Sequence, residues 1–160
     1  LAKPTLFDAS NATFTIERHF PSSREKVFQA YSDAKSKAKW FVGPEDWERS
    51  DHKLDFREGG RESVSGGPPG QPVHYFNGLY QDIVPNERIV MSYEMHMDQT
   101  RISVSLGTTE FKVDGKGTKL VYTEQIVFLD GHDHLAAREE GARALFDNLA
   151  TALEREVQAA

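Results

Sequence analysis

The sequence predicts an α+β fold in which a curved antiparallel sheet wraps around a long C-terminal helix, with elements in the order β-α-α-β6-α. Strand-like segments follow one another through short turns between residues 47 and 128, as antiparallel strands do. Apolar residues then recur at helical spacing over residues 133–158, which predicts a helix of about 39 Å at the standard rise per residue. Such a helix is long enough to cover the face that the sheet must bury.

Two short helices are expected to precede the main part of the sheet. Residues 13–20 alternate apolar and polar side chains, which predicts the first strand. A proline ends this strand, and Ser22 and Glu25 have the spacing of a capping box at a helix start. The first helix should run to about Asp33, and the second, over residues 34–41, should end before a Gly-Pro pair.

Turn residues divide the middle of the chain into strands. Residues 66–72 contain three prolines, which cannot donate to a strand ladder, so this segment is expected to form a loop. Asp114 and Gly115 begin a hairpin signal. The six expected strands span residues 48–56, 61–65, 74–84, 87–97, 101–113 and 118–129.

Composition bounds the class of protein. The 160 residues fit a single domain, predicted over residues 1–160 with a core at about 13–158. The net charge of −6 argues against a nucleic-acid partner, because phosphate binding needs a cationic face. The absence of Cys excludes disulfides and thiolate zinc sites. No run approaches the roughly 18 apolar residues of a membrane span, and no signal-peptide pattern is present, so we expect a cytoplasmic protein with no membrane partner.

Several motifs, in this order, resemble a known family. They are ERHFPSSREKVFQAYSDAKSKAKWF, LDFREGG, FNGLYQDIVPNERIVMSYE, GTKLVYTEQ and FDNLATALE. Together they are similar to the Hsp90 ATPase activator homologue family, which belongs to the START and Bet v 1-like (SRPBCC) superfamily. The resemblance covers about residues 13–154 and implies the helix-grip fold.

The resemblance implies a fold more than a reaction, because members of this superfamily serve as carriers, resistance proteins, cyclases and chaperone activators. We expect this chain to bind a small hydrophobic or aromatic molecule in a cavity between the curved sheet and the C-terminal helix. Two alternatives stay open. One is an enzyme of the cyclase or hydrolase type, which needs an acid–base pair in the cavity. The other is an interaction module whose partner is a chaperone or a second copy of the chain. No catalytic residue and no cofactor is assigned.

Aromatic side chains are candidates for the cavity lining. Trp40, Phe41 and Trp47 cluster where the short helices meet the sheet, and they either close one end of a cavity or cap the core. The register at Tyr75 and Phe76 is open, because a slip of one residue exchanges the two faces of a strand. We favour Phe76 inward, together with Gly78 and Tyr80, which share its parity.

A second candidate lining comes from residues 88–98, where alternation places Met91, Tyr93 and Met95 on one inward face. Flexible methionines suit an irregular ligand space as well as an irregular core. The hydroxyl of a buried Tyr93 needs a partner, which a ligand could supply. The predicted ligand-binding residues are Trp40, Phe41, Trp47, Phe56, Arg57, Phe76, Tyr80, Met91, Tyr93, Met95, Leu145 and Leu149, of which Arg57, Tyr80 and Tyr93 would fix the orientation of the ligand.

Polar residues of the predicted sheet lie either inside the cavity or on its solvated side, and none stands out. These are His52, Arg57, Glu62, Glu110 and Glu124. The lysines of the second short helix are expected to form a solvated basic edge. These are Lys35, Lys37 and Lys39.

One loop has residue types that bind metals. His132 and His134, with Asp130 and Asp133, precede the last helix, but Asp133 as the N-cap of that helix is the favoured interpretation. No metal site is therefore assigned.

Overall fold

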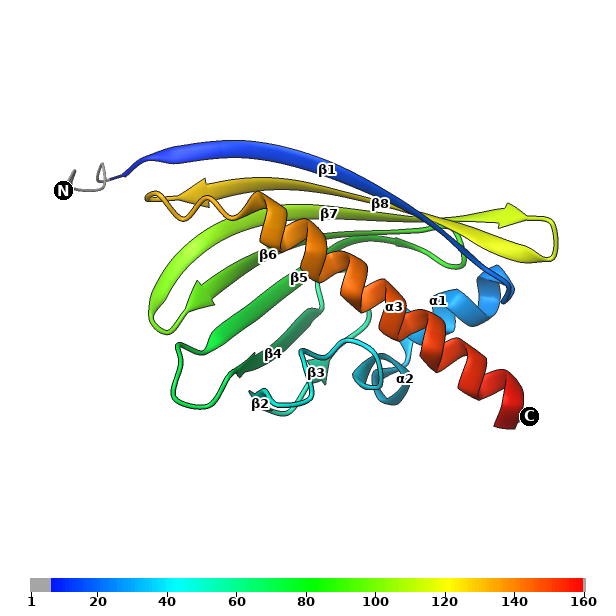
Figure 1. Cartoon of the computed structure of the whole chain (residues 1–160). Coiled ribbons are helices and arrows are strands. Elements are labelled where there is room, and N and C mark those ends of the chain that lie inside the picture. The colour runs from blue at the N-terminus through cyan, green and yellow to red at the C-terminus, as the bar shows by residue number, and fades with distance from the viewer. Residues whose placement is uncertain (1–6, 160) are drawn as a thin grey trace.

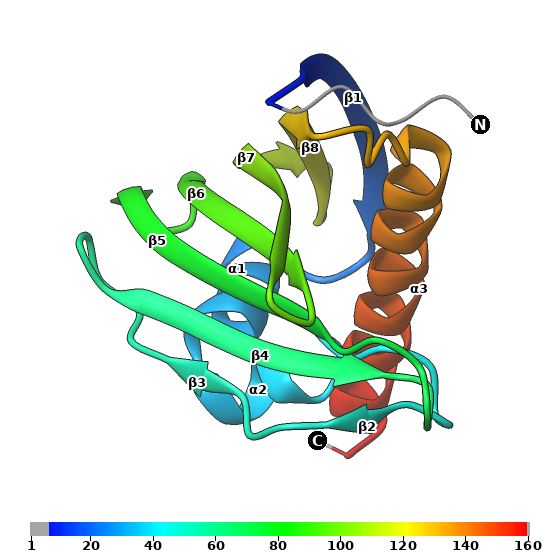
Figure 2. The same cartoon turned by 90° about the vertical axis from the view of Figure 1, so that its left-hand side faces the viewer.

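In a computed structural model, which describes residues 7–159, one antiparallel sheet bends around a long helix (Figures 1 and 2). This confirms the predicted α+β helix-grip fold. Residues 1–6 and 160, which the predicted domain of residues 1–160 includes, lie outside the described residues. None of the described helices combines the length and the apolar character that crossing a bilayer requires.

The elements follow the predicted order, with one expected strand divided in two. The strands are β1 (Ala9–Phe20), β2 (Glu48–Arg49), β3 (Lys53–Leu54), β4 (Arg61–Gly67), β5 (His74–Val84), β6 (Arg88–Met97), β7 (Thr100–Asp114) and β8 (Gly117–Leu129). The helices are α1 (Arg24–Ser32), α2 (Ala34–Ala38) and α3 (Leu135–Ala159). The sheet order is β1-β8-β7-β6-β5-β4-β2, and β3 also pairs with β4.

The strand predicted over residues 48–56 is wrong as a single element. The Ser50 amide still donates a hydrogen bond of 2.9 Å to the Ser65 carbonyl, but the chain then leaves the ladder and rejoins it only at β3. Between the two short strands, the side chain of His52 turns to Glu62, which lies on β4. The interruption of the strand therefore coincides with this side-chain contact.

The predicted starts of the first and last helices are displaced, whereas α2 begins at Ala34 as predicted. Ser23, not Ser22, is the N-cap of α1 and accepts a hydrogen bond of 3.3 Å from the Lys26 amide, so Glu25 is not the partner of a capping box. Asp133 is not at the N-cap position of α3, which begins at Leu135. Its carboxylate instead accepts a hydrogen bond of 2.6 Å from the Ser10 hydroxyl.

The core lies toward one side of the sheet. Helix α3 packs against β1 and α1, while α1 also contacts β7 and β8. Apolar side chains from these elements are buried between them. They include Phe14, Ile16 and Phe20 of β1, Val27 and Phe28 of α1, Leu120 and Ile126 of β8, and Phe146, Leu149 and Leu153 of α3. The concave surface of β5 and β6 lies away from this packed region (Figure 2).

Candidate functional site

The register of β5 and β6 places the predicted lining on the inner face of the sheet. Phe76 lies opposite Met95, Gly78 opposite Tyr93, and Tyr80 opposite Met91. Tyr75, the neighbour of Phe76, lies on the outer face and its surface is 40% exposed. The favoured register is therefore confirmed.

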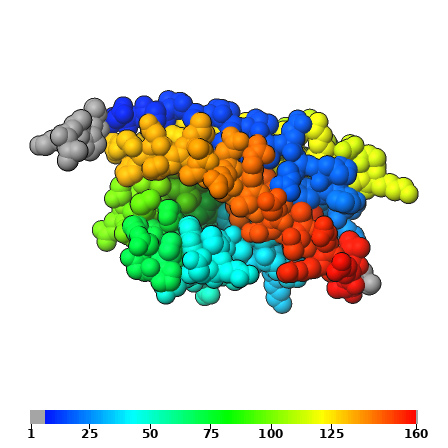
Figure 3. Space-filling view, in the orientation of Figure 1, coloured from blue at the N-terminus to red at the C-terminus, as the bar shows by residue number. Residues whose placement is uncertain are grey.

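Several inward-facing residues of β5 and β6 are less buried than the core residues of β1 and β8. Phe76, Met91, Tyr93 and Met95 remain partly exposed. Phe41, which follows α2, is partly exposed as well, and its ring lies 5.2 Å from that of Phe76 between centroids. The ring of Phe76 lies 4.9 Å from that of Tyr93. These five residues define what we call the inner groove, and Figure 3 shows the surface hollowed between the orange α3, the green strands and the cyan segment after α2.

Helix α3 forms the other side of the inner groove. Arg138 reaches the inner face of the sheet, and its guanidinium donates hydrogen bonds to Ser103 at 2.7 Å and Ser105 at 3.3 Å. Leu145 lies seven residues further along α3, on the same helical face, and is partly buried.

The remaining predicted site residues lie elsewhere. Trp40, Tyr80 and Leu149 are buried in the core, where the Trp40 indole donates a hydrogen bond of 2.9 Å to the Ala30 carbonyl. Phe56 packs edge-on against Tyr80, with ring centroids 5.0 Å apart.

Two of the predicted lining residues lie apart from the other aromatic residues. Trp47 does not join Trp40 and Phe41, because its ring stacks on His74, a residue of the same parity as Phe76, with the centroids 5.4 Å apart. Arg57 is exposed in a turn and pairs with Asp55 at 2.9 Å, so its predicted position inside the grip is wrong.

A buried cluster of four polar side chains borders the inner groove at β4, and we call it the Glu62 cluster. Oε1 of Glu62 accepts hydrogen bonds of 2.6 Å from Lys37 Nζ and from the Tyr80 hydroxyl. Oε2 lies 2.6 Å from His52 Nε2. Glu62 is 1% exposed and Lys37 5% exposed, so the pair is withdrawn from water. The predicted solvated edge is therefore wrong at Lys37.

Local structure explains why Lys37 points inward. Asp33 is the N-cap of α2 and its carboxylate accepts a hydrogen bond of 3.0 Å from the Ser36 amide, which fixes where the helix begins. Lys37 then faces the sheet, with its Nζ 4.6 Å from the ring centroid of Phe41. This distance is typical of a cation–π contact.

The charges of the Glu62 cluster set its protonation. Burial acts to raise the pKa of Glu62, but the nearby Lys37 ammonium and the hydrogen bonds from His52, Lys37 and Tyr80 outweigh it and lower this pKa to about 2. Burial and the negative charge of Glu62 raise the pKa of the Tyr80 phenol. Glu62 is therefore ionised and Tyr80 neutral near pH 7.

One atom of the Glu62 cluster has no partner. Nδ1 of His52 is buried and makes no hydrogen bond, alone among the buried side-chain nitrogen and oxygen atoms of residues 7–159. The His52 side chain is 8% exposed and lies against Phe41, with the ring centroids 5.8 Å apart.

A second buried carboxylate lies at the α3 side of the inner groove, in what we call the Glu124 cluster. Oε1 of Glu124 accepts hydrogen bonds from the hydroxyls of Tyr93 and of Tyr122, the latter at 2.5 Å. Arg138 donates to Oε2 of Glu124 at 3.3 Å and to the Tyr93 hydroxyl at 2.9 Å. Burial, together with the charge of Glu124, raises the pKa of Tyr93.

Sequence reasoning missed the two cations of these clusters. Lys37 was expected to be solvated, and Arg138 belongs to the helix face expected to be polar. The strands did contain a signal for the two carboxylates. Glu62 has the same parity as the apolar Val64, and Glu124 has the same parity as the apolar Ile126, which predicts that both face inward. Glu110, the remaining candidate carboxylate, is partly exposed and lies 3.9 Å from Lys112.

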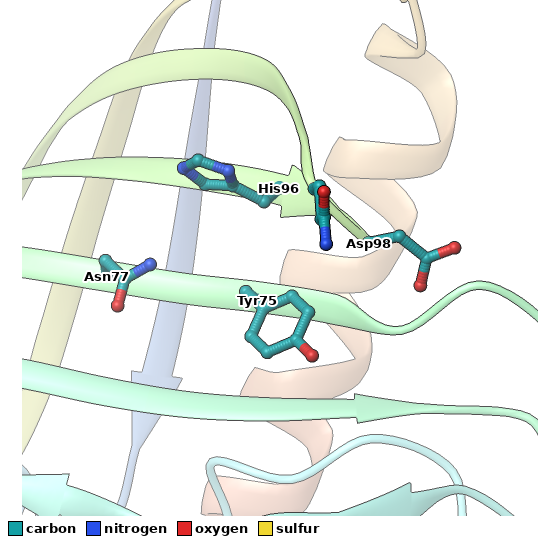
Figure 4. Close-up of a pocket in the computed structure, with 5 residues that line it drawn as sticks. Tyr75, Asn77, His96 and Asp98 are labelled. Atoms are coloured by element: carbon teal, nitrogen blue, oxygen red, sulfur yellow. The ribbon is translucent and has the colours of Figure 1, made fainter.

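Two pockets lie on the outer face of the sheet. The larger, of about 480 Å³, is lined by Tyr75, Asn77, His96, Asp98 and Gln99 (Figure 4). The second, of about 380 Å³, is lined by Tyr75, Phe76 and Asn77 and by residues of β3 and β4. The predicted cavity between the sheet and α3 is neither of these pockets, and it stays a prediction.

With this geometry in place, the comparisons assign a family. The family model described as Activator of Hsp90 ATPase homolog 1-like protein matches residues 21–154. The chain belongs to this family. No curated protein matches the chain.

Solved structures share the fold over nearly the whole chain. A protein from Rhizobium leguminosarum is 43% identical with a TM-score of 0.90, and covers 94% of this chain and 99% of its own. A protein from Rhizobium loti is 40% identical with a TM-score of 0.84, covering 91% of this chain and 99% of its own. The AHSA1-like protein from Aeromonas hydrophila, at 21% identity and a TM-score of 0.70, covers 91% of this chain and 94% of its own and shares the fold.

Proposed function

We propose that the inner groove binds a small hydrophobic or aromatic molecule. The observation that carries the proposal is the partial exposure of apolar and aromatic side chains on the concave face of β5 and β6, beside a core that is otherwise closed. Covering such surface contributes about 25 cal/mol per Å². Three aromatic rings, those of Phe41, Phe76 and Tyr93, lie in a continuous row and favour a flat ligand.

The chemistry of the two ends of the inner groove supports the same proposal. The Glu62 cluster and the Glu124 cluster each balance a carboxylate with a cation, so the groove presents little net charge to a ligand. A neutral ligand therefore fits better than an ionic one, because an unpaired charge loses its hydration on entry.

A thermal-shift titration with 2-methoxynaphthalene, a flat neutral probe, tests the proposal. At 100 times its dissociation constant, a ligand adds about 2.7 kcal/mol to the free energy of unfolding, which corresponds to roughly 5–10 °C in Tm. Native mass spectrometry of the purified protein then shows whether a small molecule is retained.

Two neighbouring residues of β5 provide matched variants. Phe76→Ala removes a ring from the inner groove, whereas Tyr75→Ala removes a ring of similar size from the outer face. We expect Phe76→Ala to lose at least half of the ligand-induced shift in Tm and Tyr75→Ala to retain it. Loss of the shift in Tyr75→Ala alone would place the ligand in the outer pockets, and the proposal would then be wrong. The same conclusion follows if no flat apolar compound shifts the wild-type protein.

A further inference from the structure

The Glu62 cluster contains a polar atom whose partner the fold does not supply. Leaving a buried acceptor or donor unpaired is unfavourable, and folded proteins pair nearly all such groups. Every other polar side-chain atom of the Glu62 cluster that is buried has a partner within the chain, which makes His52 Nδ1 an exception. An exception of this kind points to a group that arrives from outside the chain.

The hydrogen bond at the other ring nitrogen determines what that group must be. His52 Nε2 lies 2.6 Å from an oxygen of the ionised Glu62, so Nε2 carries a proton and donates it. Adding a second proton at Nδ1 would place another buried positive charge beside Lys37, whose ammonium already lies 2.6 Å from the same carboxylate. With Nε2 donating to Glu62, Nδ1 is the ring nitrogen that remains to accept a hydrogen bond, and it requires a donor.

His52 also lies where a ligand of the inner groove can approach it. Its ring packs against Phe41, and Phe41 packs against Phe76, so the three rings form one row. Phe41 belongs to residues 39–47, which contain neither helix nor strand. The Phe41 ring therefore contacts both the His52 ring and Phe76 of the inner groove, from a segment that the sheet ladder does not hold.

We propose that His52 Nδ1 accepts a hydrogen bond from a hydroxyl group of the ligand, so that the inner groove selects hydroxylated aromatic molecules over ring systems that lack a donor. Glu62 acts as a positioning residue, because its carboxylate holds the imidazole in the tautomer that leaves Nδ1 free. This inference rests on the proposed binding function and specifies the ligand class of the same groove.

Two probes that differ only at the donor test the inference. 2-Naphthol carries a hydroxyl where 2-methoxynaphthalene carries a methyl ether, so the two share a ring system and differ in their ability to donate. For the wild-type protein we expect 2-naphthol to bind about 5- to 10-fold more tightly in isothermal titration calorimetry, as one net hydrogen bond provides.

Two variants test the roles of the two ring nitrogens of His52 separately. The side-chain amide of glutamine reaches as far as Nε2, so His52→Gln keeps a donor to Glu62 and lacks the acceptor of Nδ1. Asparagine places its amide at the distance of Nδ1, so His52→Asn keeps an acceptor there. We expect the preference for 2-naphthol to disappear in His52→Gln and to persist in His52→Asn, while 2-methoxynaphthalene binds His52→Gln within twofold of wild type.

The outcomes distinguish the two proposals. If both probes bind the wild type with equal affinity, or if His52→Gln keeps the preference, the inference is wrong and the proposed groove stands. If neither probe binds, the groove and the inference fall together. A long-range ¹H–¹⁵N spectrum of the free protein tests the tautomer without any ligand: an unprotonated Nδ1 supports the inference, and a protonated Nδ1 overturns it.

Discussion

The Glu62 cluster and the Glu124 cluster contain the same kinds of side chain, but only the Glu62 cluster has a buried atom without a hydrogen-bond partner. Each has a buried carboxylate on the inner face of the sheet and a cation from a helix, with one tyrosine hydroxyl donating to Glu62 and two to Glu124. In the Glu124 cluster, Arg138 spans from α3 to β6, β7 and β8, and the buried polar atoms are hydrogen-bonded to one another. In the Glu62 cluster, a ring nitrogen of His52 is left over.

This difference separates a structural role of the Glu124 cluster from the binding role that we propose for the Glu62 cluster. Arg138 lies in the first turn of α3 and ties that end of the helix to the sheet. Lys37 similarly ties the short α2 to β4, but the same carboxylate also holds His52. We therefore expect the Glu124 cluster to respond to substitution mainly in stability, and the Glu62 cluster to respond in both stability and ligand choice.

The largest expected effect comes from Glu62→Gln. It leaves the Lys37 ammonium buried without a counter-charge, which costs about 3–5 kcal/mol of unfolding free energy. Urea denaturation measures this loss. Glu110→Gln, in the partly exposed carboxylate of β7, is the matched control and should change stability by less than about 0.5 kcal/mol. Equal effects in the two variants would contradict the account of the Glu62 cluster.

A somewhat smaller effect is expected from acid. The fold lowers the pKa of Glu62 from 4.5 to about 2, so the unfolded chain binds a proton that the folded chain does not. The resulting stability is complete above about pH 5 and is lost as pH falls toward 2, by on the order of 3 kcal/mol. Urea denaturation at several pH values measures this change. Over this range the unfolding free energy of Glu62→Gln should fall less than that of the wild type, by on the order of 3 kcal/mol. An identical pH dependence in the variant and the wild type would show that Glu62 does not carry this linkage.

Arg138→Met tests the Glu124 cluster and should cost about 1.5–3 kcal/mol, because hydrogen bonds to a charged group are lost while the apolar stem is kept. Hydrogen exchange should accelerate in the first turns of α3 and stay unchanged in α2. Arg143→Met, which removes an exposed pair with Glu139 on the same helix, should cost less than about 0.5 kcal/mol. Hydrogen exchange that accelerates equally along the whole chain would contradict a local role of Arg138 in holding α3 to the sheet.

The smallest expected effect is that of His52→Gln on stability. Glutamine retains a donor to Glu62 and removes an unpaired buried atom, so the free energy of unfolding should change by less than about 1 kcal/mol. Thermal and urea denaturation measure this. A loss as large as that of Glu62→Gln would mean that His52 serves the fold rather than the ligand.

The sequence carried enough information to predict the inner face but not the clusters. Alternation alone placed Phe76, Met91, Tyr93 and Met95 correctly, because side chains of a strand repeat every two residues. The same rule put Glu62 and Glu124 among the inward candidates. Alternation could not distinguish these two carboxylates from the other polar candidates, since a carboxylate at inward parity is buried only when a cation reaches it.

Those cations come from helices, where charged residues between apolar ones are ordinarily solvated. Lys37 meets Glu62 across 25 residues of sequence and Arg138 meets Glu124 across 14, separations that local patterns do not encode. The break between β2 and β3 has the same origin, because it depends on where His52 finds its partner.

The three methionines of the chain provide the most direct test of ligand binding, since all of them lie on the inner face of β6. Methyl spectra of protein labelled with ¹³C at methionine can be followed while 2-methoxynaphthalene is added. The inner groove predicts that the signals of Met91 and Met95 shift and saturate together with the change in Tm. A ligand that raises Tm while both methyl signals stay in place would contradict the account, because it would bind away from the concave face.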